Sequence, residues 1–147
     1  MKKIFLQAVS IILVMCTLIS GTASAADTPS VEPAANSFIS SNSAKIVSTG
    51  GGNFYVQIYI QGQYTMSQIG ATRIKVYNSD GDVAFNVAYT TTGYSHLMAY
   101  NKSTHATTAY FAGDSGESYY AVVYFYVRCT NPAGSGSHVY TTSTVKV

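Results

Sequence analysis

Charge, cysteine and tryptophan are scarce in this chain of 147 residues. It contains eight Lys and Arg, six Asp and Glu, two Cys, three Pro and no Trp. Lys2 and Lys3 precede an apolar run, Ile4–Ile19, and Ala23-Ser24-Ala25 follows it, as is typical of a cleaved secretory signal peptide. Removing residues 1–25 leaves six cationic against six anionic side chains. A neutral chain has no excess of cations to neutralise phosphates, which excludes a polybasic binder of nucleic acid.

The shortage of cysteine excludes a disulfide within the exported chain. Cys16 lies in the apolar run, so Cys129 is the single cysteine after Ala25. A free cysteine packs like a small hydrophobic residue, and we expect a buried structural thiol. Strand alternation points Arg128 to the opposite face, so no neighbouring cation would activate this thiol for catalysis. No second run of about 20 apolar residues follows, and we expect no membrane insertion after cleavage.

Metal ligands and catalytic pairs are also missing. His96, His105 and His138 are too widely spaced for a short zinc-binding motif, and we expect no metal and no cofactor. The segment Gly113-Asp114-Ser115-Gly116 is similar to a serine-protease nucleophile motif, but all four residues favour turns, and we expect a turn. The acidic residues of the domain lie in predicted turns rather than facing one cleft, so a glycosidase pair is not indicated. We expect no enzyme.

The chain is rich in aromatic residues, with thirteen Tyr and six Phe, and these alternate with polar residues in short runs. The segment Phe54–Gln61 is the clearest case, because its apolar residues all point one way. No ten-residue segment has helical periodicity. The alternation predicts an all-β domain, and turn-rich segments separate its runs into about seven or eight strands. The expected strands are Ser43–Thr49, Phe54–Gln61, Thr72–Asn78, Asp82–Tyr89, Leu97–Asn101, Thr104–Phe111, Ser118–Arg128 and His138–Val147.

The final third resembles the F and G strands of immunoglobulin-like and fibronectin type III-like sandwiches. The residues that carry the resemblance are Tyr119–Phe125, the loop Asn131–Gly134 and the closing Val145–Val147. It implies a single immunoglobulin-like antiparallel β-sandwich in which Tyr119 or Tyr120 is a corner tyrosine bonded to backbone, although the usual core Trp is absent. The expected organisation is a signal peptide at 1–25, a flexible spacer at 26–37 and the sandwich at 38–147.

The whole chain also resembles small, signal-bearing, uncharacterised secreted β-sandwich proteins of Gram-positive bacteria. The segments Met66–Ala71, Gly116–Ala121 and Tyr140–Thr142 carry this second resemblance. It implies a fold and an extracellular location. From its C-terminal residues, Ser143–Val147, we expect the protein to be released or held only non-covalently at the cell surface.

An immunoglobulin-like fold would place Thr72–Asn78, Ser118–Arg128 and His138–Val147 side by side in one sheet. Alternation then predicts a set of residues for its core face: Ile74, Val76, Tyr119, Ala121, Val123, Phe125, Val139 and Val145. The opposite parity predicts an outer face, which also includes His138. Its candidate ligand-binding residues are Tyr77, Tyr120, Tyr124, Tyr126, Tyr140, Arg73 and Lys75.

Tyrosine rings suit recognition because they bury apolar area and keep a polar hydroxyl. The alternative is that these rings pair across strands and only stabilise the sheet. The sequence therefore predicts a secreted, non-catalytic sandwich of unknown partner, with a binding module for a glycan, peptide or surface polymer as the first hypothesis. The second hypothesis is a self-associating structural surface protein.

Overall fold

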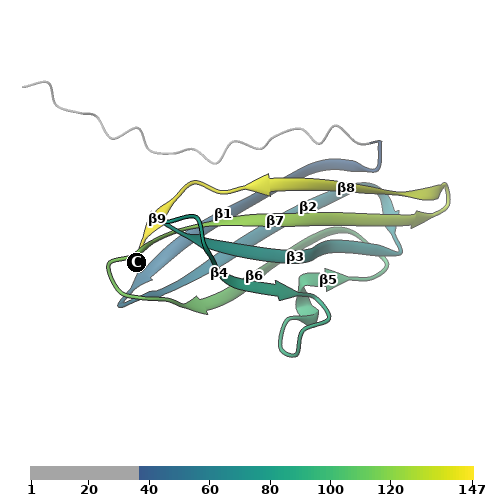
Figure 1. The fold of residues 1–147 in the computed structure, drawn as a ribbon. Helices are drawn as coiled ribbons and strands as arrows, with labels where there is room; N and C mark the ends of the chain where they lie inside the picture. Colours follow the sequence, from purple (N-terminus) through teal and green to yellow (C-terminus); the bar gives the residue numbers. More distant parts are fainter. Residues whose placement is uncertain (1–36) are drawn as a thin grey trace, which may run out of the picture.

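The computed structural model describes residues 37–147, which form two antiparallel sheets packed as a sandwich (Figure 1). The expected signal peptide at 1–25 lies outside the described residues, as does the expected spacer at 26–37 apart from Ser37. The all-β expectation is confirmed. The elements are β1 (Ile39–Gly50), β2 (Asn53–Met66), β3 (Gln68–Asn78), β4 (Val83–Ala88), the 3-10 helix η1 (Ser95–Leu97), β5 (Met98–Ala99), β6 (Lys102–Ala112), β7 (Ser118–Thr130), β8 (Ala133–Thr141) and β9 (Val145–Lys146).

The three-stranded sheet has the order β1-β2-β6, and its central strand follows the predicted alternation. Phe54, Val56, Ile58 and Ile60 are at most 1% exposed and face the second sheet. The residues between them face solvent. Burial of one face and hydration of the other is what a period-two pattern dictates for an antiparallel sheet.

The six-stranded sheet has the order β4-β3-β7-β8, with β5 also paired to β3 and β9 also paired to β7. It therefore places the predicted strands at 72–78, 118–128 and 138–147 side by side. The expected core positions on β3 and β7 are correct: Ile74, Val76, Tyr119, Ala121, Val123 and Phe125 are all buried. No helix in residues 37–147 is long and apolar enough to span a membrane.

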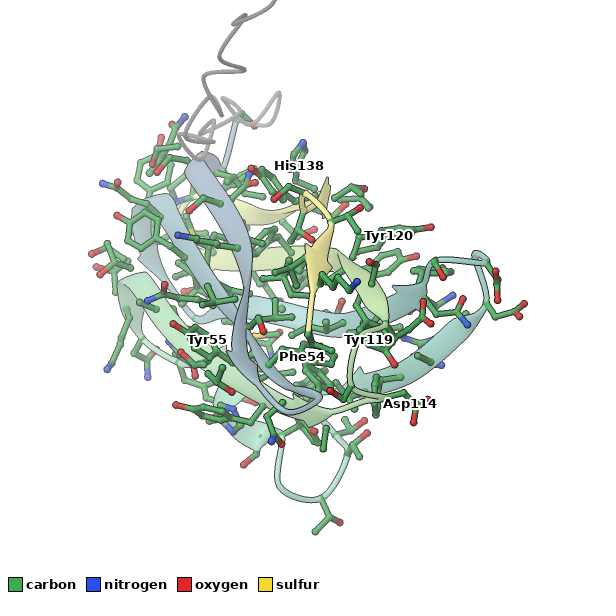
Figure 2. All side chains as sticks on the ribbon, turned by 90° about the vertical axis from the view of Figure 1, so that its left-hand side faces the viewer. Phe54, Tyr55, Asp114, Tyr119, Tyr120 and His138 are labelled. Carbon is green, nitrogen blue, oxygen red and sulfur yellow. The ribbon has the colours of Figure 1, made fainter. Side chains whose placement is uncertain are left out.

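An aromatic cluster joins the two sheets near one end of the sandwich. The Phe54 ring stacks on Phe111 from its own sheet, with centroids 5.5 Å apart, and on Tyr119 from the other sheet, at 5.0 Å. Phe85 meets Phe54 edge-on at 5.9 Å. Figure 2 shows Phe54 and Tyr119 between the sheets, whereas Tyr55 and Tyr120 lie on opposite outer sides. Such offset and edge contacts add to the burial energy of the rings.

Tyr119 is also tied to the turn that precedes β7. The Asp114 N–H donates a hydrogen bond of 3.0 Å to the Tyr119 hydroxyl. A Cβ atom at Gly113 would lie only 2.6 Å from that hydroxyl, so glycine allows the close approach of backbone and ring. Of the two tyrosines expected at a corner position, Tyr119 is therefore the one bonded to backbone.

The prediction for the last strand placed Val139 and Tyr140 on the wrong faces of the sheet. Val139, expected in the core, is 53% exposed, while Tyr140, expected on the outer face, is 8% exposed. The cause is the register with β7, which sets Tyr140 opposite buried Val123 and Val139 opposite outward-facing Tyr124, while an irregular segment at 142–144 separates β8 from β9, whose odd-numbered residues face the core. An interruption of this kind reverses the alternation.

The expectation for His138 is wrong for the same reason, whereas that for Val145 is correct. The His138 ring, expected outside, turns inward and lies 3.0 Å (Nδ1 to Oδ1) from buried Asn42 on β1. Val145, expected in the core, pairs with buried Tyr119 and is half-buried against the core, and Val147 is buried.

Candidate functional site

Six of the seven predicted site residues share one outer surface of the six-stranded sheet. We call this surface the β3–β7 face and define it by Arg73, Lys75 and Tyr77 of β3 and Tyr120, Tyr124 and Tyr126 of β7. Direct pairing of β3 with β7 brings these six side chains together from positions about 50 residues apart. Tyr140 is not part of this face, because it is buried on the inner side of β8.

Cross-strand contacts cover part of the β3–β7 face. Tyr77 and Tyr120 are cross-strand partners whose rings stack with centroids 5.1 Å apart and planes 9° apart. The Lys75 ammonium lies 5.9 Å from the centroid of Tyr124. All four tyrosines are half-buried. Facing rings in such pairs cover each other's flat surfaces, which is how cross-strand pairs stabilise a sheet.

A second tyrosine surface lies on the outer side of the three-stranded sheet. We call it the β2–β6 face and define it by Tyr55, Gln57, Tyr59 and Gln61 of β2 and Tyr110 of β6. Tyr110 is 71% exposed and Tyr59 is 37% exposed, so both are more open to solvent than any ring of the β3–β7 face. Tyr55 and Tyr110 are cross-strand partners, tilted by 55° at 5.8 Å.

The sequence predicted part of the β2–β6 face. Alternation along Phe54–Gln61 already pointed Tyr55 and Tyr59 outward. What it did not contain was the pairing of β2 with β6, which places Tyr110 beside Tyr55. The predicted site therefore lay on the six-stranded sheet, because the immunoglobulin-like resemblance indicated which of its strands are neighbours.

A shallow hollow lies beside Tyr59 on this face. The residues paired with Tyr59 on either side, Ser43 of β1 and Ala106 of β6, are small and leave the flanks of its ring uncovered. The hollow measures about 240 Å³, and Lys45 and Gln57 also line it. The Tyr59 hydroxyl donates a hydrogen bond of 3.2 Å to the Gln61 side-chain carbonyl. The hollow thus combines an aromatic wall with amide and ammonium groups.

Charge is distributed unevenly between the strands and the turns. Residues 39–50, 53–66 and 102–112, the strands of the three-stranded sheet, contain Lys45 and Lys102 but no Asp or Glu. The four carboxylates of the described domain lie in the turns that precede β4 and β7. The β2–β6 face therefore favours a neutral or anionic partner over a cationic one.

One of these turn carboxylates is held by hydrogen bonds. The Ser79 hydroxyl and the Ser118 N–H both donate to Glu117, and these bonds, above all that from Ser79, lower the pKa of Glu117 below its usual range. They stabilise the charged carboxylate and join the β3–β4 turn to the start of β7. Within residues 37–147, no group of three or more His, Cys, Asp or Glu side chains is placed to hold a metal ion.

His96 and His105 stabilise the edge of β6. The His105 Nε2–H donates to the His96 carbonyl over 2.9 Å, and the His96 Nε2–H donates to the Thr108 carbonyl over 3.1 Å. Burial lowers the pKa of His105 below its usual 6.5. A neutral imidazole bonded to backbone in this way stabilises the η1 segment against the strand.

Cys129 has the expected structural environment. It is 3% exposed, and its Sγ atom lies 3.6 Å from the Thr65 carbonyl and 3.4 Å from the Asn131 carbonyl. Arg128 points outward, as alternation predicted. The expectation of a buried thiol is confirmed.

Comparison of the chain with protein-family models, with curated proteins and with solved structures found no match. The case for a function therefore depends on the two tyrosine faces and their surroundings.

Proposed function

We propose that the chain is an exported, non-catalytic sandwich of immunoglobulin-like topology that binds a glycan on the β2–β6 face. The strand order supports this topology. If β1, β2 and β6 are taken as A, B and E, and β4, β3, β7 and β8 as C′, C, F and G, the two sheets have the order of immunoglobulin-like sandwiches. The hydrogen bond from the Asp114 N–H to Tyr119 is in keeping with the corner tyrosine of those folds.

The positions of the histidines, the cysteine and the carboxylates favour binding over catalysis. His96 and His105 donate to backbone carbonyls, and Cys129 is buried. The carboxylates lie in turns rather than on opposite sides of a cleft, which a glycosidase pair requires.

The observation that carries the proposal is the exposed Tyr59 ring, which lines a hollow together with polar side chains, on the same face as the exposed Tyr110 ring. The apolar face of a sugar ring packs on an aromatic ring, and amide groups donate to and accept from its hydroxyls. Tyr55 and Tyr59 are four residues apart and span about 13 Å along β2, at about 3.3 Å per residue. A surface of this length suits an extended oligosaccharide lying along the strand.

We assign to the β3–β7 face the alternative role, which is stabilisation of the sheet. Its rings are half-buried, and two of them stack on each other, so their main contribution is to cross-strand stability. The proposal therefore moves the preferred ligand site from one outer face to the other.

A comparison of two matched double variants tests this assignment. The secreted protein, a Tyr59→Thr/Tyr110→Thr variant and a Tyr77→Thr/Tyr120→Thr variant are mixed with insoluble peptidoglycan and with insoluble β-glucan, and the bound fraction is measured. The first variant should bind at least about tenfold more weakly and melt like the parent, because exposed rings contribute little to folding. The second should keep its binding and melt at a lower temperature.

Two results would contradict the proposal. Undiminished binding by the Tyr59→Thr/Tyr110→Thr variant would remove the β2–β6 face as the site. Loss of binding by the Tyr77→Thr/Tyr120→Thr variant without a change in melting would place the site on the β3–β7 face.

A further inference from the structure

The four outer edges of the two sheets differ in how they are protected. An unpaired strand edge presents backbone N–H and C=O groups to any other strand, and proteins normally cover, bend or charge such edges. The edge of β6 is covered by the segment around η1. The Tyr94 hydroxyl donates to the Tyr110 carbonyl over 3.2 Å, and His96 donates to the neighbouring Thr108 carbonyl. Two acceptors on that edge are therefore already occupied.

The edges of β4 and β1 are interrupted. β4 is six residues long, and its register with β3 shifts between Val76 and Tyr77, next to a turn that carries Asp80 and Asp82. The register of β1 with β2 shifts at both of its ends, and β1 carries Lys45. Short strands, irregularities and charges are the devices that discourage pairing with another chain.

Among residues 37–147, the edge strand β8 is neither short, nor interrupted, nor charged. Its nine residues, Ala133–Thr141, pair with β7 in an unbroken register and include no charged residue and no proline. Within residues 37–147, β7 is the one strand that pairs with β8. The outward-facing residues Ser135, Ser137 and Val139 are exposed. A long, flat, uncharged edge of this kind is a template for a further strand.

The inner side of β8 is held rigidly, so the edge is preformed. The Phe38 ring lies against Gly134, where an added Cβ would come within 2.2 Å of it. The His138 ring is bonded to buried Asn42 of the opposite sheet. A strand that is already extended loses little further entropy when a partner pairs with it.

We propose that β8 pairs antiparallel with β8 of a second copy of this chain. A two-fold axis through Ser137 sets Ser137 against its own copy, Ser135 against Val139 of the partner subunit and Gly136 against the partner's His138. No like charges meet in this pairing, because the strand contains none. The stretch before Ser37 is a poorer partner, because Pro29 and Pro33 lack the N–H groups that a ladder needs.

The pairing determines the arrangement of the dimer. An antiparallel pair of identical strands is related by an axis perpendicular to the sheet, so both β3–β7 faces lie on the same side of one continuous sheet. Both β2–β6 faces lie together on the opposite side. Two glycan sites on one side of a dimer would gain from simultaneous attachment to a polymer.

Measurement of molar mass over a concentration series tests the pairing. The secreted protein, a Ser137→Lys variant and a Gln57→Lys control are studied by sedimentation velocity. The parent and the control should double in mass as concentration rises, whereas Ser137→Lys should stay monomeric, because its pairing would set two ammonium groups against each other. Circular dichroism should show the same fold in all three. A parent that is monomeric at every concentration, or a Ser137→Lys variant that dimerises like the parent, would overturn the proposal.

A cross-linking experiment covers the case in which Ser137→Lys fails to fold. Ser137→Cys should form a disulfide-linked dimer under mild oxidation, because paired residues on the two-fold axis bring their Cβ atoms within reach of a disulfide. Ser103→Cys, an exposed serine on β6, serves as the control. Equal yields of dimer from both variants would show random collision and would overturn the proposal.

Discussion

Replacing Tyr119 with Phe removes one hydroxyl from the core and leaves the ring in place. The stack on Phe54 at 5.0 Å is kept, and only the hydrogen bond of 3.0 Å from the Asp114 N–H is lost. A neutral hydrogen bond contributes a net 0.5–1.5 kcal/mol or so to stability. Because Asp114 is exposed, water can reach the freed N–H and limit the penalty. We expect a loss of about 1 kcal/mol, or a melting temperature lower by about 4–6 °C for a domain of this size.

Tyr120→Phe is the matched control, since it makes the same chemical change one residue away. Tyr120 lies on the outer face, and its hydroxyl has no hydrogen-bond partner within the described residues. Its stability should change by less than about 0.5 kcal/mol. Urea unfolding followed by circular dichroism measures both variants, with an unchanged slope as the check that the unfolded states are alike. Equal destabilisation by the two exchanges would refute the role given to the Tyr119 hydroxyl.

Four further outcomes are expected. Ile58→Ala should lower the free energy of unfolding by about 2–4 kcal/mol in urea titrations, because it leaves a cavity at a fully buried site; a loss under about 1 kcal/mol would contradict that packing. His105 resists protonation when folded, so the unfolded chain binds more protons and stability should fall as pH drops below about 6.5, with a smaller fall in His105→Gln; identical pH profiles in urea would contradict this. Mass spectrometry of the secreted protein should show a chain that begins at Ala26, and retention of Lys2 would contradict cleavage. Reductant should leave the melting temperature unchanged, because Cys129 is a buried free thiol; a clear drop would indicate a disulfide between chains.

The core of the sandwich was predictable where strands are regular. On β2, β3 and β7, residues such as Ile58, Val76 and Val123 are buried as their alternation required. Side-chain direction in a strand is a local property of the pleated backbone, so it can be read without knowing the partner strand. The turn around Gly81, with φ at +85°, was predictable for the same reason, since an Asp-Gly pair tolerates positive φ wherever it lies.

The candidate site was predictable only in part. Six side chains of the β3–β7 face were correctly placed together, but the sequence did not show that Tyr77 and Tyr120 would cover each other. Tyr140 was misplaced because one alternation was counted through 138–147, whereas an irregular segment at 142–144 separates β8 from β9 and pairing with buried Val123 sets the side of Tyr140. Strand parity beyond an interruption depends on such contacts and cannot be counted from the sequence.

The sequence by itself determined that this chain forms an all-β domain with few charged residues, with tyrosines on its strand surfaces and a single cysteine inside. These properties follow from composition and from period-two alternation, which act locally. Only the tertiary structure decided which rings remain open to solvent. Tyr59 is exposed beside the small Ala106 of β6, while Tyr120 is half-covered by Tyr77, because the neighbours of a residue across a sheet come from distant parts of the chain. Alternation within each strand therefore determines which side chains face outward, and the pairing of strands determines which of them remain open to a ligand.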